Sequence, residues 1–302
     1  MKILITGAFG QLGSALEESL SFKNEIYKTG KSIPKGEVGI ELNIQNIVYL
    51  KEVLNTIEPD IIINLAAMTN VDDCESHPEL AKQINAESVQ NLVNCFNGKI
   101  IQLSTDYVFD GLKKDAYTEI DKANPQSVYG KSKYEAETAI QESNPKHIIL
   151  RTSWVYSVRG KNFLTTILGM AQNKESFDIV FDQIGSPTSA IFIANTILEI
   201  TKKIEQIENN NLYGIYNLTC LGSTSWFEFA KTIILYAQEE GLNLKSTPES
   251  IKPIKSSDFP TLASRPKNST LNNQKLTKTF EINCPEWQNE LKLIMTDKTL
   301  EM

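Results

Sequence analysis

The sequence is poor in cysteine and histidine, and it contains no long apolar run. Its four cysteines are scattered without a C-x-x-C pair, and only two histidines occur among 302 residues. This usage is typical of reduced thiols in the cytoplasm and indicates neither a disulfide framework nor a metal site. No segment approaches the ~18 consecutive apolar residues of a membrane span, and a glycine interrupts the opening stretch MKILITG too soon for a signal peptide. We therefore expect a cytoplasmic protein that does not enter a membrane.

Basic residues are outnumbered as well. The chain has 30 Lys and Arg residues against 37 Asp and Glu residues, which is a net charge of −7. This balance argues against nucleic acid or an anionic membrane as the main partner. The hydrophobic content of 41% and the charged content of 22% are ordinary for a globular enzyme. The length suits one large domain or two moderate ones.

The first half of the chain alternates between strand-like and helix-like segments. Short, β-branched apolar runs at 2–6, 60–66, 99–105 and 147–153 are typical of buried parallel strands. Amphipathic patterns lie between them, so we predict an α/β fold with a doubly wound parallel sheet of the Rossmann type. The predicted helices cover residues 11–20, 44–57 and 78–96.

The pattern changes after about residue 155. Helix-like stretches at 160–172 and 224–241 dominate, and strands become rarer. Residues 244–271 are rich in Pro, Ser and Lys, but apolar side chains punctuate them, so we expect an ordered layer of loops. A second, smaller α/β lobe over the carboxyl edge of the sheet fits this pattern. The predicted division assigns residues 1–155 and roughly 184–205 to a dinucleotide-binding domain, and residues 156–183 and 206–302 to the second lobe.

Three glycines follow the first predicted strand. Gly7, Gly10 and Gly13, in ITGAFGQLGSAL, have the spacing G-x-x-G-x-x-G at the start of a predicted helix. Glycine allows the backbone to approach a pyrophosphate, and the helix N-terminus offers free N–H groups. An ordinary tight turn is the alternative. The position in the first strand-to-helix turn favours dinucleotide binding.

The tip of the second predicted strand bears on the choice of dinucleotide. An acidic residue normally ends this strand and binds the ribose hydroxyls of NAD. Here the stretch NEIYKTGKS has Lys28 and Lys31 and no carboxylate at the expected tip. Cationic side chains suit a 2′-phosphate, which favours NADPH. Solvated surface lysines are the alternative, so NADH stays possible.

The stretch SVYGKSKYEAE places Tyr129 and Lys133 one helical turn apart, and thus on the same face of a helix. An ammonium near a phenol favours the phenolate and lowers the tyrosine pKa from its usual ~10. The pair is therefore either a tuned proton donor or a surface contact. Glu135 and Glu137 follow closely, and we predict that they form a solvated face of this helix.

Together, the glycine pattern, the order of elements and the Tyr-x-x-x-Lys pair resemble the extended short-chain dehydrogenase/reductase superfamily. Further motifs narrow the resemblance to the dTDP-4-dehydrorhamnose reductase family, and they run in order across nearly the whole chain. They are NLAAMTNVDDCE (64–75), STDYVFDG (104–111), LRTSWVY (150–156), NFLTTIL (162–168), DQIGSPT (182–188), TSWFEFA (224–230) and RPKNSTL (265–271).

The resemblance implies a reaction and a catalytic triad. NAD(P)H would reduce the C4 keto group of dTDP-4-dehydro-β-L-rhamnose to give dTDP-L-rhamnose, a precursor for polysaccharide biosynthesis. Tyr129 would protonate the C4 oxygen and Thr105 would hydrogen-bond it. Lys133 would hold the nicotinamide ribose and lower the tyrosine pKa.

The resemblance also implies residues that bind each ligand, with the second lobe binding the nucleotide sugar and Arg265 clamping its diphosphate. It allows no magnesium site to be assigned, no other metal site is predicted, and a monomer or a homodimer is expected. The predicted cofactor-binding residues are Gly7, Phe9, Gly10, Gln11, Leu12, Gly13, Lys28, Asn43, Ile44, Ala66, Ala67, Thr69, Tyr129 and Lys133. The predicted substrate-binding residues are Val71, Thr105, Asp106, Tyr129, Trp154, Asn162, Gln183 and Arg265.

The same residues also distinguish between this activity and those of related proteins. Nucleotide-sugar 4,6-dehydratases have an acid and a base directly after the threonine, whereas Thr105 is followed by Asp106 and Tyr107, so the base is missing. The motifs of the second half argue against 4-epimerases. A reductase of a different nucleotide-linked 4-keto sugar stays open. A non-catalytic regulatory subunit of the same fold, such as the β subunit of methionine adenosyltransferase, is disfavoured because Thr105, Tyr129 and Lys133 are all present.

Overall fold

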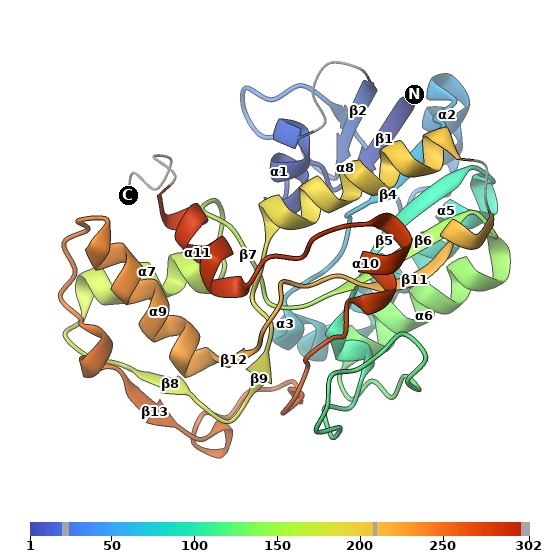
Figure 1. The fold of residues 1–302 in the computed structure, drawn as a ribbon. Coiled ribbons are helices and arrows are strands. Elements are labelled where there is room, and N and C mark those ends of the chain that lie inside the picture. Colours follow the sequence, from blue (N-terminus) through green and yellow to red (C-terminus); the bar gives the residue numbers. More distant parts are fainter. Residues whose placement is uncertain (20–23, 208–209, 297–302) are drawn as a thin grey trace.

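A parallel sheet of seven strands forms the centre of the computed structural model, which describes residues 1–19, 24–207 and 210–296 (Figure 1). The strand order is β3-β2-β1-β4-β5-β6-β11, and every pairing is parallel. The predicted doubly wound parallel sheet is confirmed. The strands are β1 (Lys2–Thr6), β2 (Glu25–Gly30), β3 (Ile40–Glu41), β4 (Ile61–Asn64), β5 (Lys99–Thr105), β6 (His147–Thr152) and β11 (Gly214–Asn217).

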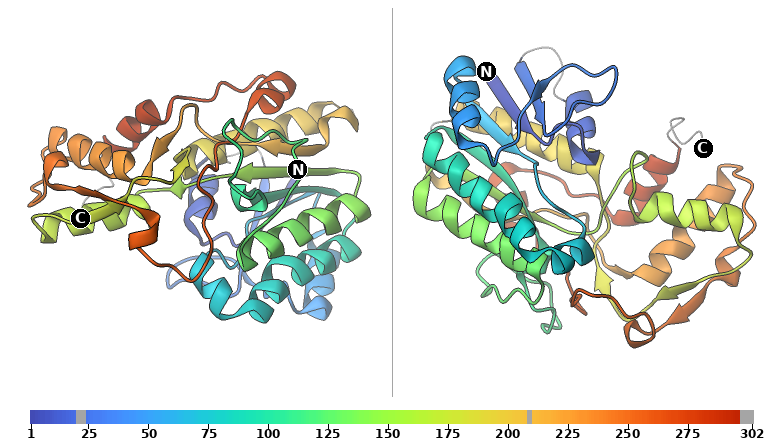
Figure 2. Two further views of the ribbon diagram at one scale, coloured as in Figure 1. Left: turned by 90° about the horizontal axis from the view of Figure 1, so that it is seen from below. Right: turned by 180° about the vertical axis from the view of Figure 1, so that it is seen from behind.

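Helices cover both faces of the sheet. The helices α1 (Gln11–Ser19) and α8 (Ala190–Gln206) lie on one face, and α2 (Ile47–Ile57), α5 (Ser88–Cys95) and α6 (Val128–Ser143) lie on the other (Figures 1 and 2). Successive residues of a strand point to opposite faces. Ile3 and Ile5 therefore join one apolar core with α1 and α8, whereas Leu4 joins a second core with α2. Burial on both sides explains why each strand is a continuous apolar run.

The predicted helices of the first half differ from the observed ones mainly at their ends. Leu20, expected as the last residue of the first helix, lies outside the described residues. The second helix begins at Ile47 because the side chain of Asn46 accepts a hydrogen bond from Tyr49 N at 3.2 Å and caps it. The third is divided into α4 (Pro78–Lys82), the π-helical turn η1 (Gln83–Glu87) and α5. A shorter helix, α3 (Val71–Ser76), precedes it.

The second lobe consists of helices with short strand pairs and lies beside the carboxyl ends of the central strands (Figure 1). Its helices are α7 (Phe163–Asn173), α9 (Trp226–Glu239) and α11 (Trp287–Met295). Its own strand pair is β8 (Asp178–Val180) with β13 (Lys252–Ile254). Two further pairs include strands of the range 184–205, namely β9 (Ile184–Gly185) with β12 (Thr224–Ser225), and β10 (Thr188–Ser189) with β7 (Val155–Tyr156). The expected loop layer at 244–271 contains β13 and the 3₁₀ turns η4 (Pro248–Ser250) and η5 (Ser256–Asp258).

One part of the predicted division needs correction. β11 lies in the range 206–302 that we assigned to the second lobe, but it pairs with β6 and extends the central sheet. The helix α10 (Gln274–Phe280) packs against β11. Its sequence GIYN contains only two consecutive apolar residues, so it lacks the continuous apolar run that indicated β1, β4, β5 and β6. Residues 208–209 and 297–302 of this range lie outside the described residues.

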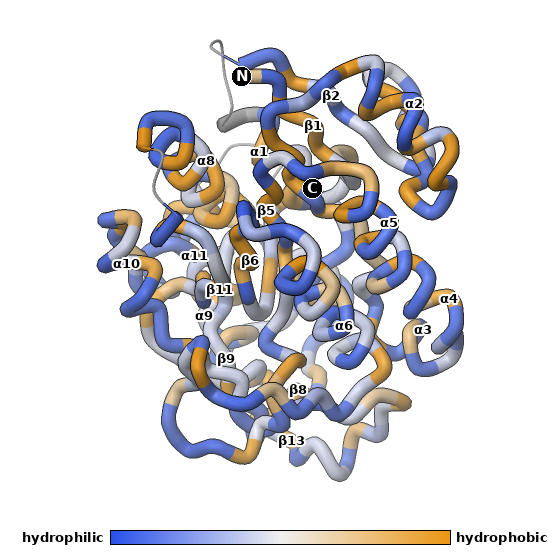
Figure 3. The backbone as a smooth tube through the Cα atoms, turned by 90° about the vertical axis from the view of Figure 1, so that its right-hand side faces the viewer, coloured by the Kyte–Doolittle hydropathy of each residue, from blue (hydrophilic) through white to orange (hydrophobic). Residues whose placement is uncertain are grey.

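The distribution of apolar residues follows these layers. In Figure 3 the strands β1, β5 and β6 are coloured as hydrophobic, and the surrounding helices alternate between hydrophobic and hydrophilic residues, as amphipathic helices do. Across residues 1–19, 24–207 and 210–296, no helix combines the length and the apolar character needed to span a bilayer.

Candidate active site

A crevice of about 1220 Å³ lies between the carboxyl ends of the central strands and the second lobe. It opens where the strand order reverses, with β2 on one side of β1 and β4 on the other. In doubly wound sheets ligands bind at this switch point. With the exception of Lys28, all of the predicted cofactor-binding and substrate-binding residues line the crevice. Residues as far apart in the sequence as Gly7 and Arg265 thus surround one cavity.

The glycine turn at the end of β1 is held tightly against the loop after β4. Gly7 has a φ of +64°, and a Cβ there would lie 2.8 Å from Ala66 N. A Cβ on Gly13 would overlap the backbone of Ala8. The two positions therefore need glycine. Gly10, whose N–H donates to Gly7 O at 3.1 Å, borders the crevice at the N-terminal end of α1, where N–H groups favour an anion.

At the tip of β2, Lys28 does not occupy the cofactor-binding position that we predicted. Its ammonium forms ion pairs with Glu17 at 2.8 Å and Glu37 at 2.9 Å and lies 5.4 Å from the centre of the Phe9 ring. The lysine is thus already neutralised and does not line the crevice. Lys31 does line it and is exposed. The structure therefore offers Lys31, and not Lys28, to a ligand at this tip.

Thr105, Tyr129 and Lys133 meet at the junction of β5 and α6. The helix begins at Val128 because the Ser127 hydroxyl caps it, accepting from Gly130 N at 3.1 Å. The Tyr129 phenol is hydrogen-bonded to Thr105. The Lys133 ammonium donates to the carbonyl oxygen of Leu103 at 2.7 Å. The spacing of four residues therefore does place both side chains toward β5, and all three line the crevice.

The expected lowering of the tyrosine pKa is wrong for this structure. Burial raises the pKa of Tyr129 above its usual value, and the hydrogen bond from Thr105 offsets this only in part. The Lys133 ammonium is bonded to a backbone carbonyl instead of the phenol. Burial lowers the pKa of Lys133 to about 8, and the charge of Glu137 opposes this shift. At neutral pH the phenol therefore keeps its proton and the lysine is mostly charged.

Glu137 is not on a solvated face, as we had predicted, although Glu135 is exposed. The Glu137 side chain is fully buried and forms a bidentate ion pair with Arg151, from Nε at 2.9 Å and from Nη2 at 2.6 Å. The Ser104 hydroxyl also donates to it. The signal that could have found it is its spacing: Glu137 lies one further turn beyond Tyr129 and Lys133, on the same face.

Asp106 is a buried carboxyl group beside the triad. It is 2% exposed, and its Oδ1 accepts from the Thr105 hydroxyl at 3.0 Å. Its Oδ2 has no hydrogen-bond partner among the described residues. Burial raises the pKa of Asp106 to about 7. Hydrogen bonds from Ser269 and Thr105 oppose this rise, and the group can hold a proton close to neutral pH.

Aromatic side chains form the wall on the side of the second lobe. Trp154, which follows β6 with a φ of +48°, stacks on Trp226 at 3.4 Å between ring centroids and 5° between planes. Phe163 lies against Trp226 at 4.4 Å. A Cβ on Gly185 would overlap the Trp154 indole. Sequence reasoning missed Trp226 as a residue of the site, although it stands in the quoted motif TSWFEFA.

Arg265 spans the mouth of the crevice. Its Nη2 donates to Asp72 Oδ2 at 2.9 Å, and Asp72 Oδ1 accepts from Ala263 N at 3.0 Å. The Arg265 Nε is buried without a hydrogen-bond partner among the described residues. One edge of the guanidinium is thus held by a carboxylate while another nitrogen is unused. The contact joins the first turn of α3 to a segment 193 residues further along the chain.

Two further predicted residues, Asn162 and Gln183, line the crevice. Asn162 caps α7 by accepting from Thr165 N at 3.2 Å, and its amide donates to the carbonyl oxygen of Ser157 at 2.8 Å. It therefore shapes the crevice wall while its own hydrogen bonds are largely satisfied. Gln183 is 9% exposed and lies in the same wall.

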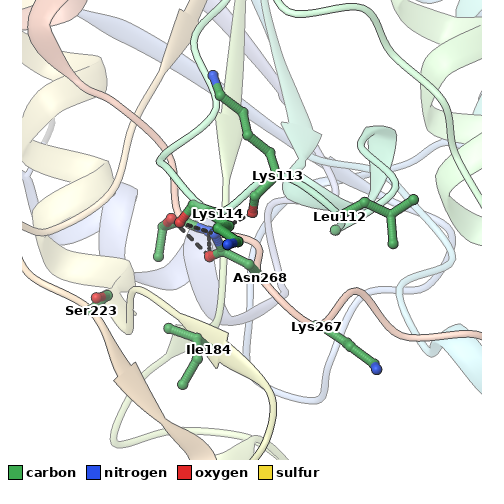
Figure 4. A pocket seen from close by; sticks show the side chains of 9 residues that line it. Leu112, Lys113, Lys114, Ile184, Ser223, Lys267 and Asn268 are labelled. Atoms are coloured by element: carbon green, nitrogen blue, oxygen red, sulfur yellow. Dashed lines mark hydrogen bonds between the residues drawn. The ribbon is translucent and has the colours of Figure 1, made fainter.

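A smaller hollow of about 400 Å³ lies between the segments 111–114 and 267–270 (Figure 4). Three lysines border it, but Lys113 is paired with Asp121 at 2.7 Å. Figure 4 shows the side chains of Lys113 and Lys267 pointing in different directions. Asn268 Nδ2 donates to the carbonyl oxygens of Lys113 and Lys114 and holds the two segments together. These cations do not converge on a common point.

Known proteins are similar to this chain over nearly its whole length. The family model described as the RmlD substrate binding domain matches residues 1–300. The dTDP-4-dehydrorhamnose reductase of Sinorhizobium fredii is 37% identical over 305 residues, which cover 100% of this chain and 99% of that protein. A crystal structure of a dTDP-4-dehydrorhamnose reductase from Clostridium acetobutylicum has 36% identity and a TM-score of 0.87, covering 98% of each chain. The corresponding Bacillus anthracis enzyme, in complex with NADP, has 35% identity and a TM-score of 0.87, covering 98% of this chain and 99% of that one.

Proposed function

The chain belongs to the RmlD substrate-binding-domain family, and on this premise we propose that it reduces dTDP-4-dehydro-β-L-rhamnose to dTDP-L-rhamnose with NADPH. The observation that carries the proposal is the meeting of Thr105, Tyr129 and Lys133 in the crevice at the switch point of the sheet. The names of the relatives at 33–39% identity support the same activity.

The residues at β1 fit a dinucleotide. Gly7, Gly10 and Gly13 line the crevice, so the backbone of this turn is open to a pyrophosphate at the N-terminus of α1. Lys31, which lines the crevice at the tip of β2, supports NADPH, as does the NADP bound to the Bacillus anthracis relative. When bound, the reduced nicotinamide supplies the hydride that adds to C4 of the sugar.

The chain's own residues supply the proton and the orientation. Tyr129 keeps its phenolic proton at neutral pH because burial raises its pKa, and it gives that proton to the C4 oxygen as the carbonyl double bond breaks. Thr105 donates a hydrogen bond to the same oxygen, and this bond strengthens as negative charge develops there. The charged Lys133 binds the ribose hydroxyls next to the nicotinamide.

The second lobe would bind the nucleotide sugar. The stacked pair of Trp154 and Trp226 offers a flat apolar surface, and the unused Nε of Arg265 suits a diphosphate oxygen. In this division, residues 1–155, 184–205 and β11 carry the cofactor, and the remaining residues of the second half carry the substrate. The four cysteines are free thiols, in keeping with the proposed cytoplasmic location.

The proposal is tested by following NADPH oxidation with freshly generated dTDP-4-dehydro-β-L-rhamnose. We expect wild-type turnover and a loss of ~10²–10⁴-fold in kcat for Tyr129→Phe, since a positioned general acid contributes about that much. Tyr134→Phe is the matched control, because Tyr134 lies on the same helix but is exposed. Full activity of Tyr129→Phe would remove Tyr129 as the proton donor. NADPH binding without turnover of this sugar would reject the substrate.

A further inference from the structure

A buried cluster of Ser104, Glu137 and Arg151 lies behind the active site, and no step described above uses it. Glu137 is 0% exposed and Arg151 is 3% exposed. The carboxylate accepts two hydrogen bonds from Arg151 and one from Ser104. Removing both charges from water is costly, and well-packed apolar residues in place of such a pair are often as stable. Stability alone is therefore a weak reason for this cluster.

The cluster belongs to the same two elements that carry the reacting groups. Tyr129, Lys133 and Glu137 follow one another at single helical turns, so they share the face of α6 that packs on β5. Three consecutive residues of β5 meet this face. The contacts are Thr105 with Tyr129, Leu103 with Lys133 and Ser104 with Glu137. A displacement of the helix along the strand would therefore break all three contacts together.

Arg151 connects this arrangement to the next strand. It lies on β6 directly opposite Ser104 in the parallel register. Its guanidinium packs over the Phe109 ring at 5.1 Å. Glu137 is the carboxylate that neutralises it among the described residues. One carboxylate thus joins α6, β5 and β6 at the level of the active site.

The same carboxylate acts on the charge of Lys133. Burial lowers the pKa of Lys133 to about 8, and the negative charge of Glu137 is the effect that raises it. The exposed charged side chains of α4 and of the π-helical turn η1 lie in solvent. The other titratable or charged groups on α6 and on the elements packed against it are Tyr129, Lys131, Tyr134, Glu135 and Glu142 of α6, Asp106 and Tyr107 of η2 (Asp106–Val108), Asp72, Asp73, Cys74 and Glu75 of α3, Cys95 of α5, Lys99 of β5, and His147 and Arg151 of β6.

We propose that Glu137 is a positioning residue of the reaction: its carboxylate, held by Arg151, keeps Lys133 charged and fastens α6 to β5. This inference rests on the proposed function, in which a charged Lys133 binds the cofactor ribose. Glu137 itself touches neither the substrate nor the cofactor. Its effect reaches the reaction through the protonation of Lys133.

The experiment compares Glu137→Gln with wild type and with Glu135→Gln, an exposed neighbour on the same helix. Glutamine keeps the shape of the side chain and one acceptor oxygen for Ser104 and Arg151 Nε, but it removes the charge and the acceptor that faces Arg151 Nη2. The profile of kcat/KM against pH reports groups of the free enzyme. We expect an alkaline fall near pH 8 in wild type and in Glu135→Gln, and a fall ~1 pH unit lower in Glu137→Gln. An unchanged profile in Glu137→Gln would overturn the proposal.

A second variant covers the case in which Glu137→Gln does not fold because Arg151 loses its counter-charge. The double variant Glu137→Gln/Arg151→Met removes both charges and leaves no buried ion unpaired. Since Glu137 lies on the helix of Lys133 and Arg151 lies beyond it, we expect a smaller shift in the same direction. A folded double variant with the wild-type profile would assign the pair a purely structural role.

Binding of NADPH alone separates this inference from the substrate assignment. Titration of each variant with NADPH, followed by fluorescence at a series of pH values, needs no sugar. We expect the binding curves to show the same displacement of the alkaline limb. A wild type that binds NADPH but leaves the sugar unreduced would contradict the proposed substrate, and the displacement in Glu137→Gln would still decide the role of the carboxylate.

Discussion

The contact between Asp72 and Arg265 allows a graded test of how Arg265 takes part in substrate binding. Asp72 holds the guanidinium at 2.9 Å through one oxygen and the backbone of Ala263 at 3.0 Å through the other. If this contact orients Arg265 toward the diphosphate of the substrate, weakening it must raise KM. If Asp72 instead competes with the diphosphate for the guanidinium, weakening it must lower KM. The sign of the change therefore decides between the two roles, and we expect KM to rise.

The size of the effect follows from the two contacts. Both side chains are about one-third exposed, at 30% for Arg265 and 34% for Asp72, so their ion pair is worth ~0.5–1 kcal/mol. Asp72→Asn removes this charge but can still accept from Ala263 N, and we expect KM to rise about two- to fivefold. Asp72→Ala loses the second hydrogen bond as well, which adds ~1 kcal/mol, so the rise becomes roughly ten- to thirtyfold.

Steady-state kinetics with the dTDP sugar at saturating NADPH measure both constants. The value of kcat should stay within about twofold of wild type, because Asp72 acts on binding and not on the proton transfer. Asp73→Asn is the control, since Asp73 lies in the same first turn of α3 but is exposed. A lower KM in Asp72→Asn, or a fall in kcat at constant KM, would refute the reasoning.

Two further predictions concern the cofactor tip and the buried acid. Lys31→Ala should weaken the binding of NADPH about fivefold and leave the binding of NADH unchanged. Lys28→Ala should affect the binding of both cofactors equally, because Lys28 is already neutralised by two carboxylates. Isothermal titration with both cofactors measures these affinities, and equal effects of the two variants would contradict the prediction. Asp106→Asn should raise the free energy of unfolding by ~1–3 kcal/mol above about pH 7, and the gain should vanish toward pH 4. The sign follows because burial raises the folded-state pKa of Asp106 to about 7, so wild type loses stability as the pH rises from about 4 to 7. Urea unfolding at several pH values measures this difference, and a gain in stability that is independent of pH would contradict the prediction.

Local sequence patterns were sufficient to predict the central strands and the glycine turn. The runs KILIT and KIIQLST coincide with β1 and β5 from end to end, because a strand buried on both faces needs apolar residues at every position. The glycine turn after β1 could be predicted in the same way. Gly10 and Gly13 pack against atoms close in the chain, and Gly7 packs against the residues that follow β4. The motifs in their order across the chain were sufficient for the family.

Contacts between distant segments escaped the same reasoning. Lys28 and Lys31 are alike in the sequence, but Glu17 and Glu37 neutralise Lys28 and leave Lys31 to border the crevice. Glu137 looked like a solvated residue because its partner Arg151 comes from another strand. The short strand β11 is recognisable only through its pairing with β6.

The sequence by itself determined the alternation of strands and helices, the position of the glycine turn and the one-turn spacing of Tyr129 and Lys133. Each of these depends on residues within a few positions of one another. The tertiary structure decided which charges are paired, which are buried and which face the crevice. Burial lies behind the raised pKa of Tyr129 and the lowered pKa of Lys133, and a side chain's distance from water is set by all the segments packed around it.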